Sequence, residues 1–221
     1  VLLSDFALVE DNTIDNFATG IFIEDSDFVD VLGNTIDDTN DENVYGIRLL
    51  NANSGLVFEN TVNDAGTGIS VEDSINGEIA TNTVKSSAAV GISLDNADDS
   101  LVRDNAVDNA GSHGIAAFDS DNIAIRDNTV TVTGLGSDYV SDGIHVDGSD
   151  GVDITDNTIT DAGNEGILVM NSDDVDIKDN VINSAYSDGV RVWNVTDADI
   201  ITNTINGTDN DQGIDVEDSD N

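Results

Sequence analysis

The chain has 221 residues, of which 46 are Asp or Glu and six are Lys or Arg, so its formal net charge at pH 7 is −40. This charge argues against a nucleic acid partner, because binding to phosphates requires a basic patch. The absence of cysteine excludes disulfides and thiolate metal sites, and the absence of an 18-residue apolar run argues against a membrane span.

A repeat of 22 to 29 residues runs along the whole chain and is defined by one glycine and one asparagine. The glycines, each of which precedes an apolar pair, are Gly20, Gly46, Gly68, Gly91, Gly114, Gly143, Gly166, Gly189 and Gly213. The asparagines, each of which opens an Asn-x-Ile or Asn-x-Val triplet, are Asn12, Asn34, Asn60, Asn82, Asn105, Asn128, Asn157, Asn180 and Asn203. From glycine to asparagine the distance is always 14 residues, whereas from asparagine to glycine it varies from 8 to 15. The repeat thus has a rigid part and an elastic part.

The rigid part predicts short strands in a fixed order. After Gly143, the apolar residues Ile144 and Val146 alternate with His145 and Asp147, which is the period of a strand with one buried face. A second alternation precedes each asparagine, and a third short strand follows it. Three strands per repeat, stacked on like neighbours, predict an all-β fold: a right-handed, single-stranded parallel β-helix of about nine coils.

The asparagine column predicts a structural ladder inside the solenoid. Stacked Asn side chains at a tight interior turn are expected to bond to one another and to the backbone of neighbouring coils, where water cannot reach. The repeat glycines are expected to supply backbone freedom where the coil turns. A second column, of Asp and Asn, lies five residues after each glycine and is interrupted only by Gly148.

The Gly-Ile-x-Val and Asp-Asn-x-Ile segments of each coil resemble the parallel β-helix repeat of the pectate-lyase-like superfamily. The resemblance is closest to the NosD-like, or carbohydrate-binding and sugar hydrolase, branch, and it covers essentially the whole chain. It implies an architecture more than an activity, because this fold serves lyases, hydrolases, epimerases, adhesins and phage spikes. Residues 1–221 are expected to form one domain. No polar cap is visible in the sequence at either end, so we expect a fragment of a longer chain or neighbours stacked on the ends.

Two long insertions interrupt the elastic part, at Thr35 to Tyr45 and at Thr129 to Asp142, and the second contains Tyr139. Long loops on one edge of a solenoid often line its binding site. His113, which directly precedes a repeat glycine, is expected to be solvated in a turn.

The strand after each glycine exposes two outward columns, which hold the only Trp, the only Met, two of the four Arg and one of the two His. Nothing in the repeat requires these residues, so we interpret this face as a groove for an extended polysaccharide. Aromatic side chains would stack on sugar rings, and Arg would pair with carboxylates or sulfates. An alternative is that an adjacent domain or a second copy covers the apolar members. The predicted ligand-binding residues are Arg48, Phe118, His145, Asp147, Met170, Arg191 and Trp193.

The candidate catalytic residues are His145, Asp147, Asp95 and Tyr139. Asp95 and Asp147 are expected two coils apart, roughly 9 to 10 Å, near the separation used in inverting glycoside hydrolysis. A lyase or epimerase would need a base such as His145 and a group that neutralises the sugar carboxylate. However, the Asp-Pro-His motif of mannuronan epimerases cannot occur in a chain without Pro, and the Asn-Thr-Asp and Gly-His-Gly motifs of polygalacturonases are absent. These departures argue against an enzyme.

The acidity has two candidate explanations. Carboxylates at this density repel one another unless salt or bound cations screen them. The Asp-rich, Lys-poor composition resembles that of haloarchaeal proteins, which implies a high-salt medium. Alternatively, calcium is bound by Asp from neighbouring coils, for which Asp173, Asp174 and Asp197 are candidates; no other cofactor is predicted.

Three functional hypotheses follow from these patterns. The first is a secreted or cell-surface, salt-adapted β-helix domain that binds polysaccharide along the exposed face. The second is a structural module of a surface filament, spike or adhesin, which contacts copies of itself or adjacent domains through the open ends. The third is a polysaccharide lyase, epimerase or hydrolase.

Overall fold

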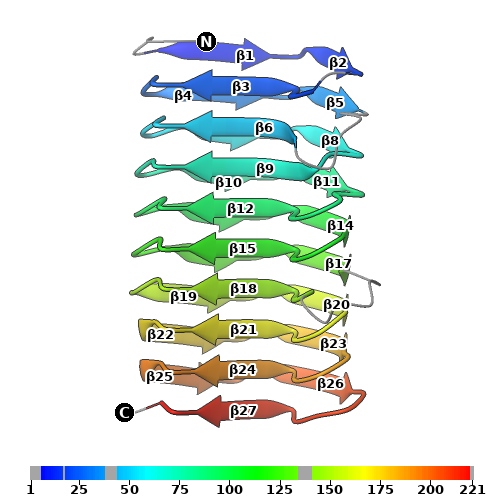
Figure 1. Ribbon diagram of the computed structural model, residues 1–221, viewed down its shortest axis with the longest axis vertical. Helices are drawn as coiled ribbons and strands as arrows, with labels where there is room; N and C mark the ends of the chain where they lie inside the picture. The colour runs from blue at the N-terminus through cyan, green and yellow to red at the C-terminus, as the bar shows by residue number, and fades with distance from the viewer. Residues whose placement is uncertain (1–5, 17, 38–43, 134–140, 220–221) are drawn as a thin grey trace.

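The computed structural model describes residues 6–16, 18–37, 44–133 and 141–219. Three nine-stranded sheets, in which all neighbouring strands are parallel, form an all-β solenoid. In Figure 1 the front strands run to the left as the chain descends and those behind run to the right, which is the sense of a right-handed coil. The predicted parallel β-helix is confirmed: nine levels of strands are stacked, joined by eight complete turns between Gly20 and Gly213. The described part of the chain has no helix that could cross a membrane.

Each level contributes one strand to each sheet. Sheet 1, which follows the repeat glycine, contains β3 (Ile21–Glu24), β6 (Tyr45–Leu50), β9 (Thr67–Glu72), β12 (Ile92–Asp95), β15 (Ile115–Phe118), β18 (Ile144–Asp147), β21 (Ile167–Met170), β24 (Val190–Trp193) and β27 (Ile214–Glu217). Sheet 2, which precedes the repeat asparagine, contains β1 (Ala7–Glu10), β4 (Val29–Leu32), β7 (Leu56–Phe58), β10 (Glu78–Ala80), β13 (Leu101–Arg103), β16 (Ala124–Arg126), β19 (Val152–Thr155), β22 (Asp173–Lys178) and β25 (Thr196–Ile201). Sheet 3, which follows the asparagine, contains β2 (Thr13–Asp15), β5 (Thr35–Asp37), β8 (Thr61–Asn63), β11 (Thr83–Lys85), β14 (Ala106–Ala110), β17 (Thr129–Thr133), β20 (Thr158–Ala162), β23 (Val181–Ala185) and β26 (Thr204–Thr208).

The strand register aligns equivalent positions of successive repeats. In sheet 1, Ile144 pairs with Ile167 and His145 pairs with Leu168. The inward column is fully buried, with Ile144 and Ile167 both 0% exposed, and each buried Ile stabilises the fold by about 1.5–3 kcal/mol. Because side chains alternate along a strand, the residues between them form outward rows. Residues distant in sequence are therefore direct neighbours on this face.

The repeat asparagines form a continuous hydrogen-bonded ladder. Asn157 Nδ2 donates to the carbonyl of Ile125 at 2.8 Å and to Asn180 Oδ1 at 3.0 Å. Its own Oδ1 accepts from both the backbone N and the Nδ2 of Asn128, each at 3.0 Å. The same pattern of bonds recurs from Asn12 to Asn203. The ladder satisfies backbone groups in a turn that water cannot reach.

The column of Asp and Asn five residues after the glycine follows from backbone conformation. Its members have φ near +50°, for example 48° at Asp73 and 53° at Asn171. Asn and Asp tolerate this left-handed region better than other residues with a side chain. Gly148, which interrupts the column, has φ of +68°, so glycine replaces Asp or Asn there without a change of backbone path.

The repeat glycines serve close packing, so the expectation that they supply backbone freedom was wrong. None of those in the described residues has a positive φ. A Cβ atom on Gly166 would lie 2.5 Å from the carbonyl oxygen of Gly189 and 2.7 Å from Cγ2 of Ile182. Both approaches are too short for a side chain, because a close-packed interior cannot shift a neighbouring backbone at low cost.

Candidate functional site

The residue directly before each repeat glycine forms a further column, at the start of sheet 1. In four successive levels this residue is titratable: His113, Asp142, Glu165 and Asp188. They are neighbours because the N–H of the following glycine donates to the carbonyl one level on, as from Gly143 to Glu165 at 3.0 Å. All four side chains are buried, with exposed fractions of 7, 0, 3 and 2%. We call these four residues the titratable column.

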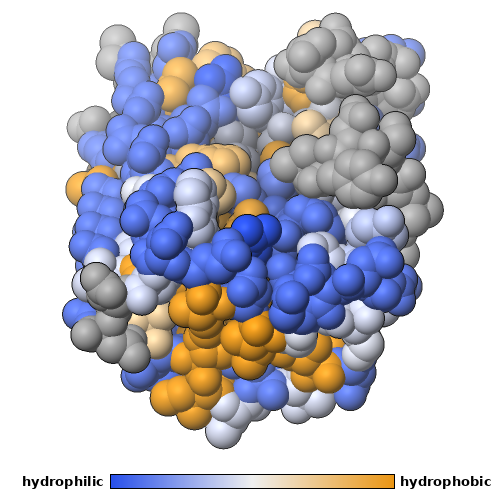
Figure 2. All heavy atoms as spheres, turned by 60° about the horizontal axis from the view of Figure 1, so that its bottom comes forward, coloured by the Kyte–Doolittle hydropathy of each residue, from blue (hydrophilic) through white to orange (hydrophobic). Residues whose placement is uncertain are grey.

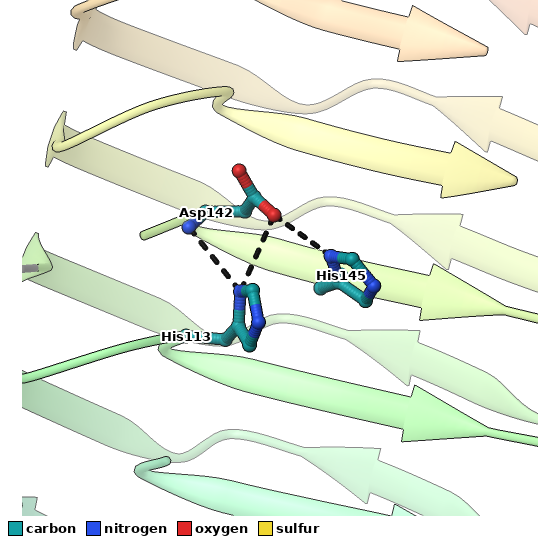
Figure 3. A group of neighbouring side chains, drawn as sticks. All are labelled: His113, Asp142 and His145. Carbon is teal, nitrogen blue, oxygen red and sulfur yellow. Dashed lines mark hydrogen bonds and ion pairs between the residues drawn. The ribbon is translucent and has the colours of Figure 1, made fainter. Parts of the chain in front are cut away.

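Asp142 joins two histidines (Figure 3). Its Oδ2 lies 2.8 Å from Nδ1 of His145 and 3.2 Å from Nδ1 of His113, and the two imidazole rings are 4.3 Å apart between centroids. The backbone N–H of Asp142 also lies 3.4 Å from Nδ1 of His113. Its other oxygen, Oδ1, accepts from Nδ2 of Asn164 and from the backbone N of Glu165, each at 3.1 Å. His145 belongs to the adjacent outward row of sheet 1, so two columns meet at this carboxylate.

Burial and hydrogen bonding shift the pKa values of the two carboxyl groups of this site, Asp142 and Glu165, in opposite directions. Burial acts to raise the pKa of Asp142, but hydrogen bonds from His113 and His145 outweigh it and hold the pKa well below its ordinary value. Burial raises the pKa of Glu165 to about 8, and the hydrogen bond to Asp142 and the charge of Asp142 add to this effect. Arg191, whose Nη1 is 3.7 Å from Glu165 Oε1, offsets only part of it. At neutral pH the pair therefore holds its charge on Asp142 and its proton on Glu165.

The two arginines predicted to bind a ligand are already paired with acids. Arg191 lies 3.0 Å from Glu217 Oε2 and 3.6 Å from Asp215 Oδ2, in addition to its contact with Glu165. Arg48 makes a two-pronged bond to Glu72, with Nε 2.9 Å from Oε1.

The guanidinium of Arg48 also stacks on an aromatic ring, which belongs to Tyr45 at 4.6 Å. Acidic side chains therefore neutralise both arginines, and the ring of Tyr45 covers Arg48 in addition.

What we call the apolar strip of sheet 1 is formed by Phe118 on β15, Leu168 and Met170 on β21, and Trp193 on β24; on β18, between the first two of these strands, the same rows hold His145 and Asp147. Met170 and Trp193 are register neighbours on β21 and β24, and Phe118 lies 5.4 Å from the ring of His145. Trp193 is 38% exposed, and the other three are half-buried. Three steps of about 4.8 Å separate β15 from β24, so the strip extends for about 14 Å.

The remaining predicted ligand-binding residues lie at different distances from this strip. His145 and Asp147 lie on β18, within the levels that it crosses. Arg191 borders it on β24, next to Leu168 in register. Arg48 lies apart, on β6.

The candidate catalytic residues are distributed over sheet 1. His145 contacts Asp142 rather than Asp147, and Asp147 Oδ1 instead accepts from Nδ2 of Asn171 at 2.7 Å. Asp95 and Asp147 share one row, but Phe118 stands between them. Tyr139 lies outside the described residues, as do residues 38–43 of the first long insertion and residues 134–140 of the second.

The three acids predicted to bind calcium are distinguished by their backbone, which makes a hydrogen bond or adopts a left-handed conformation. The backbone N of Asp173 donates to Asp150 Oδ1 at 2.8 Å, and the same bond links Asp150 to Asp121 one level earlier. Asp174 and Asp197 occupy turn positions with φ of 55°. Calcium binding by these acids stays a prediction. Within the described ranges, three His, Asp or Glu ligand atoms come within 4.8 Å of one another only at His113, Asp142 and His145.

The titratable column was missed by sequence reasoning. His113, expected to be solvated, is 7% exposed and packs against the ring of His145. The signal was present in the sequence: the residue before the glycine is Thr, Tyr, Thr and Val in the first four repeats and His, Asp, Glu and Asp in the next four. This position lies before the strand, which starts after the glycine, and so falls outside the strand's period of two.

Comparison of the sequence with protein families gives one match that spans nearly the whole chain. The family model described as "Periplasmic copper-binding protein (NosD)" matches residues 3–142 and 114–221. A search of curated protein sequences finds no relative.

Solved structures share the fold at low sequence identity. PfbA, a surface adhesin of Streptococcus pneumoniae, is 13% identical with a TM-score of 0.76, over 94% of this chain and 61% of that one. The periplasmic alginate epimerase AlgG is 17% identical with a TM-score of 0.65, over 97% of this chain and 50% of that one. Tailspike protein 2 from Escherichia coli O157:H7 bacteriophage CAB120 is 10% identical with a TM-score of 0.64, over 95% and 31%. This chain therefore spans between about a third and three fifths of their lengths.

Proposed function

This chain belongs to the NosD family, and we propose that it is an extracellular or cell-surface β-helix module that binds an extended, neutral glycan along the apolar strip of sheet 1. The fold is shared with a surface adhesin, a tailspike and a polysaccharide epimerase, which supports a surface module that recognises carbohydrate.

The observation that carries this proposal is the apolar strip itself. Trp193 and Met170 stand side by side on an outward face, in a chain with 46 acidic residues, and the coil packing does not require either of them. Neighbouring apolar side chains that remain accessible on an outward face, as Leu168, Met170 and Trp193 do, usually mark a contact surface. Aromatic rings on a flat sheet present large, rigid faces on which sugar rings stack.

The charges favour a neutral glycan. Arg191 and Arg48 are each matched by acids, with Glu217 and Glu72 at hydrogen-bonding distance. A net charge of −40 repels a polyanion at low ionic strength. Among the described residues, Arg191, which borders the strip, is therefore surrounded by acids that weaken its attraction for carboxylates or sulfates.

Replacement of Phe118 and Trp193 together by Ala is expected to weaken glycan binding by about 30- to 100-fold, because two stacking surfaces are lost. Affinity electrophoresis in gels containing neutral glucans, mannans or xylans measures this directly. Tyr186→Ala is the matched control, because Tyr186 is an exposed aromatic residue outside sheet 1. Equal retardation of the double variant and the native chain, or stronger binding to alginate than to every neutral glycan, would contradict the proposal.

A structural role is the second candidate function, and the fold shared with a surface adhesin and a tailspike supports it. At the C-terminal end, Ile201, Ile214 and Val216 are 44, 47 and 52% exposed, and Figure 2 shows apolar side chains gathered there. At the N-terminal end, Phe6 stacks on Phe28 with 5.5 Å between ring centroids, and both are exposed. A further coil, from this chain or another copy, would cover such surfaces.

End-to-end association would appear as concentration-dependent sedimentation at molar NaCl. The double variant Ile214→Asp, Val216→Asp is expected to sediment as a monomer, because charges on the stacking surface oppose contact. Ile75→Asp is the control, since Ile75 is similarly exposed, at 45%, but lies at an inner level. A native chain that stays monomeric at all concentrations argues against assembly through its ends.

The family's description names copper, and the described residues offer suitable donors at one place. His113 and His145 present imidazole nitrogens toward the carboxylate of Asp142, and the chain contains no cysteine. Imidazole and carboxylate donors suit copper(II), zinc(II) and nickel(II). The residues therefore fit such an ion, which would supply a Lewis-acidic centre when bound.

A further inference from the structure

The two imidazole side chains of this chain converge on one carboxylate oxygen. His113 and His145 are its only two histidines, and they come from adjacent levels of the solenoid. Both direct Nδ1 toward the same oxygen, Oδ2 of Asp142 (Figure 3). Burial removes water from each imidazole ring, which costs free energy. Histidines without a specific contact would therefore be expected to stay in solvent rather than meet at a buried carboxylate.

We propose that His113, His145 and Asp142 form a specific binding site for one first-row transition-metal dication, with copper(II) bound most tightly. The ligand atoms are the two Nδ1 atoms and Asp142 Oδ2. This inference is independent of the glycan proposal, because the site is buried beside the strip rather than on its exposed surface.

The spacing of the ligand atoms fits one shared ion. Asp142 Oδ2 is 2.8 Å and 3.2 Å from the two imidazole nitrogens, and all three atoms lie within 4.8 Å of one another. Ligands that bind one ion at about 2.0–2.2 Å stand about 3 Å apart. Small movements of the side chains would therefore suffice for binding.

The surroundings of these three residues are suited to hold them in place. Their exposed fractions are 7, 8 and 0%, so their conformations are restricted before binding. Asp142 Oδ1 is held by Asn164 Nδ2 and by the backbone N of Glu165. Hydrogen bonds of this kind around a metal-binding carboxylate orient it and raise affinity.

The test uses the full chain after treatment with EDTA, in molar NaCl with excess magnesium to occupy surface carboxylates. Isothermal titration with copper(II), zinc(II) and nickel(II) is expected to give one ion per chain, with copper(II) the tightest, as the general affinity order predicts. Electron paramagnetic resonance of the copper(II) form is expected to show coupling to two imidazole nitrogens, which only these two histidines can supply. This signal does not depend on whether any variant folds.

Variants assign the site. His113→Ala and His145→Ala are each expected to lower copper(II) affinity about a hundredfold, and Asp142→Asn about tenfold or more. Asp188→Asn is the matched control, because Asp188 is equally buried in the same column but is not part of the cluster. Its affinity should equal that of the native chain.

Two results would overturn the proposal. Copper(II) that binds the His113→Ala, His145→Ala double variant as tightly as the native chain, or that shows no imidazole coupling, would belong to surface carboxylates. A native chain that binds no ion above the magnesium background would show that the two histidines serve only as hydrogen-bond partners of Asp142.

Discussion

Asn157→Ala is expected to lower the free energy of unfolding by about 3–6 kcal/mol. Asn157 is 0% exposed, and its removal leaves the backbone N and Nδ2 of Asn128 without their acceptor and the carbonyl of Ile125 without its donor. Each buried polar group left unpaired costs about 1–3 kcal/mol. Urea denaturation at molar NaCl, followed by circular dichroism, measures the change.

The control for this prediction is an exposed asparagine with a similar contact. Asn206 Nδ2 donates to Asn183 Oδ1 at 2.9 Å, but the pair is exposed. Because water replaces the lost bond, Asn206→Ala is expected to change stability by about 0.5 kcal/mol or less. If the two variants lost equal stability, the ladder would have no special role in holding the coils together.

Raising the NaCl concentration from about 0.1 M to about 1 M is expected to raise the melting temperature by roughly 10 °C or more. The screening length falls from about 10 Å to about 3 Å over this range. Acids stacked at successive levels, such as Asp121, Asp150 and Asp173, are only about one strand spacing apart. With 46 acids against six bases, repulsion is greater in the compact state than in the extended chain. Screening therefore stabilises the folded state.

A chelator separates this effect from calcium binding. If screening by salt dominates, EGTA leaves the melting curve unchanged at every NaCl concentration. If calcium bridges acids such as Asp173, Asp174 and Asp197, EGTA lowers the melting temperature and NaCl has little effect. A melting temperature indifferent to both reagents would remove both explanations of the acidity.

The rows of sheet 1 were predictable because a solenoid turns sequence period into spatial order. Once glycines recur at a constant distance from asparagines, the side chains of His145 and Leu168 must become neighbours. The turn positions with a left-handed backbone were also predictable, because Asp and Asn recur there in the sequence. The role of the repeat glycines was misjudged, because the clash at Gly166 is with Gly189 and Ile182 of other coils.

The amino-acid sequence by itself determined the architecture, the inward and outward faces and the position of the apolar strip, since all of these follow from local period and stacking. Only the tertiary structure decided the pairing of Arg48 and Arg191 with acids and the meeting of His113 with His145 at Asp142. These contacts run between columns and across levels, where side-chain reach, rotamer and burial set the partner. A repeat period carries no information about those quantities, because it specifies which residues align but not toward which neighbour each side chain turns.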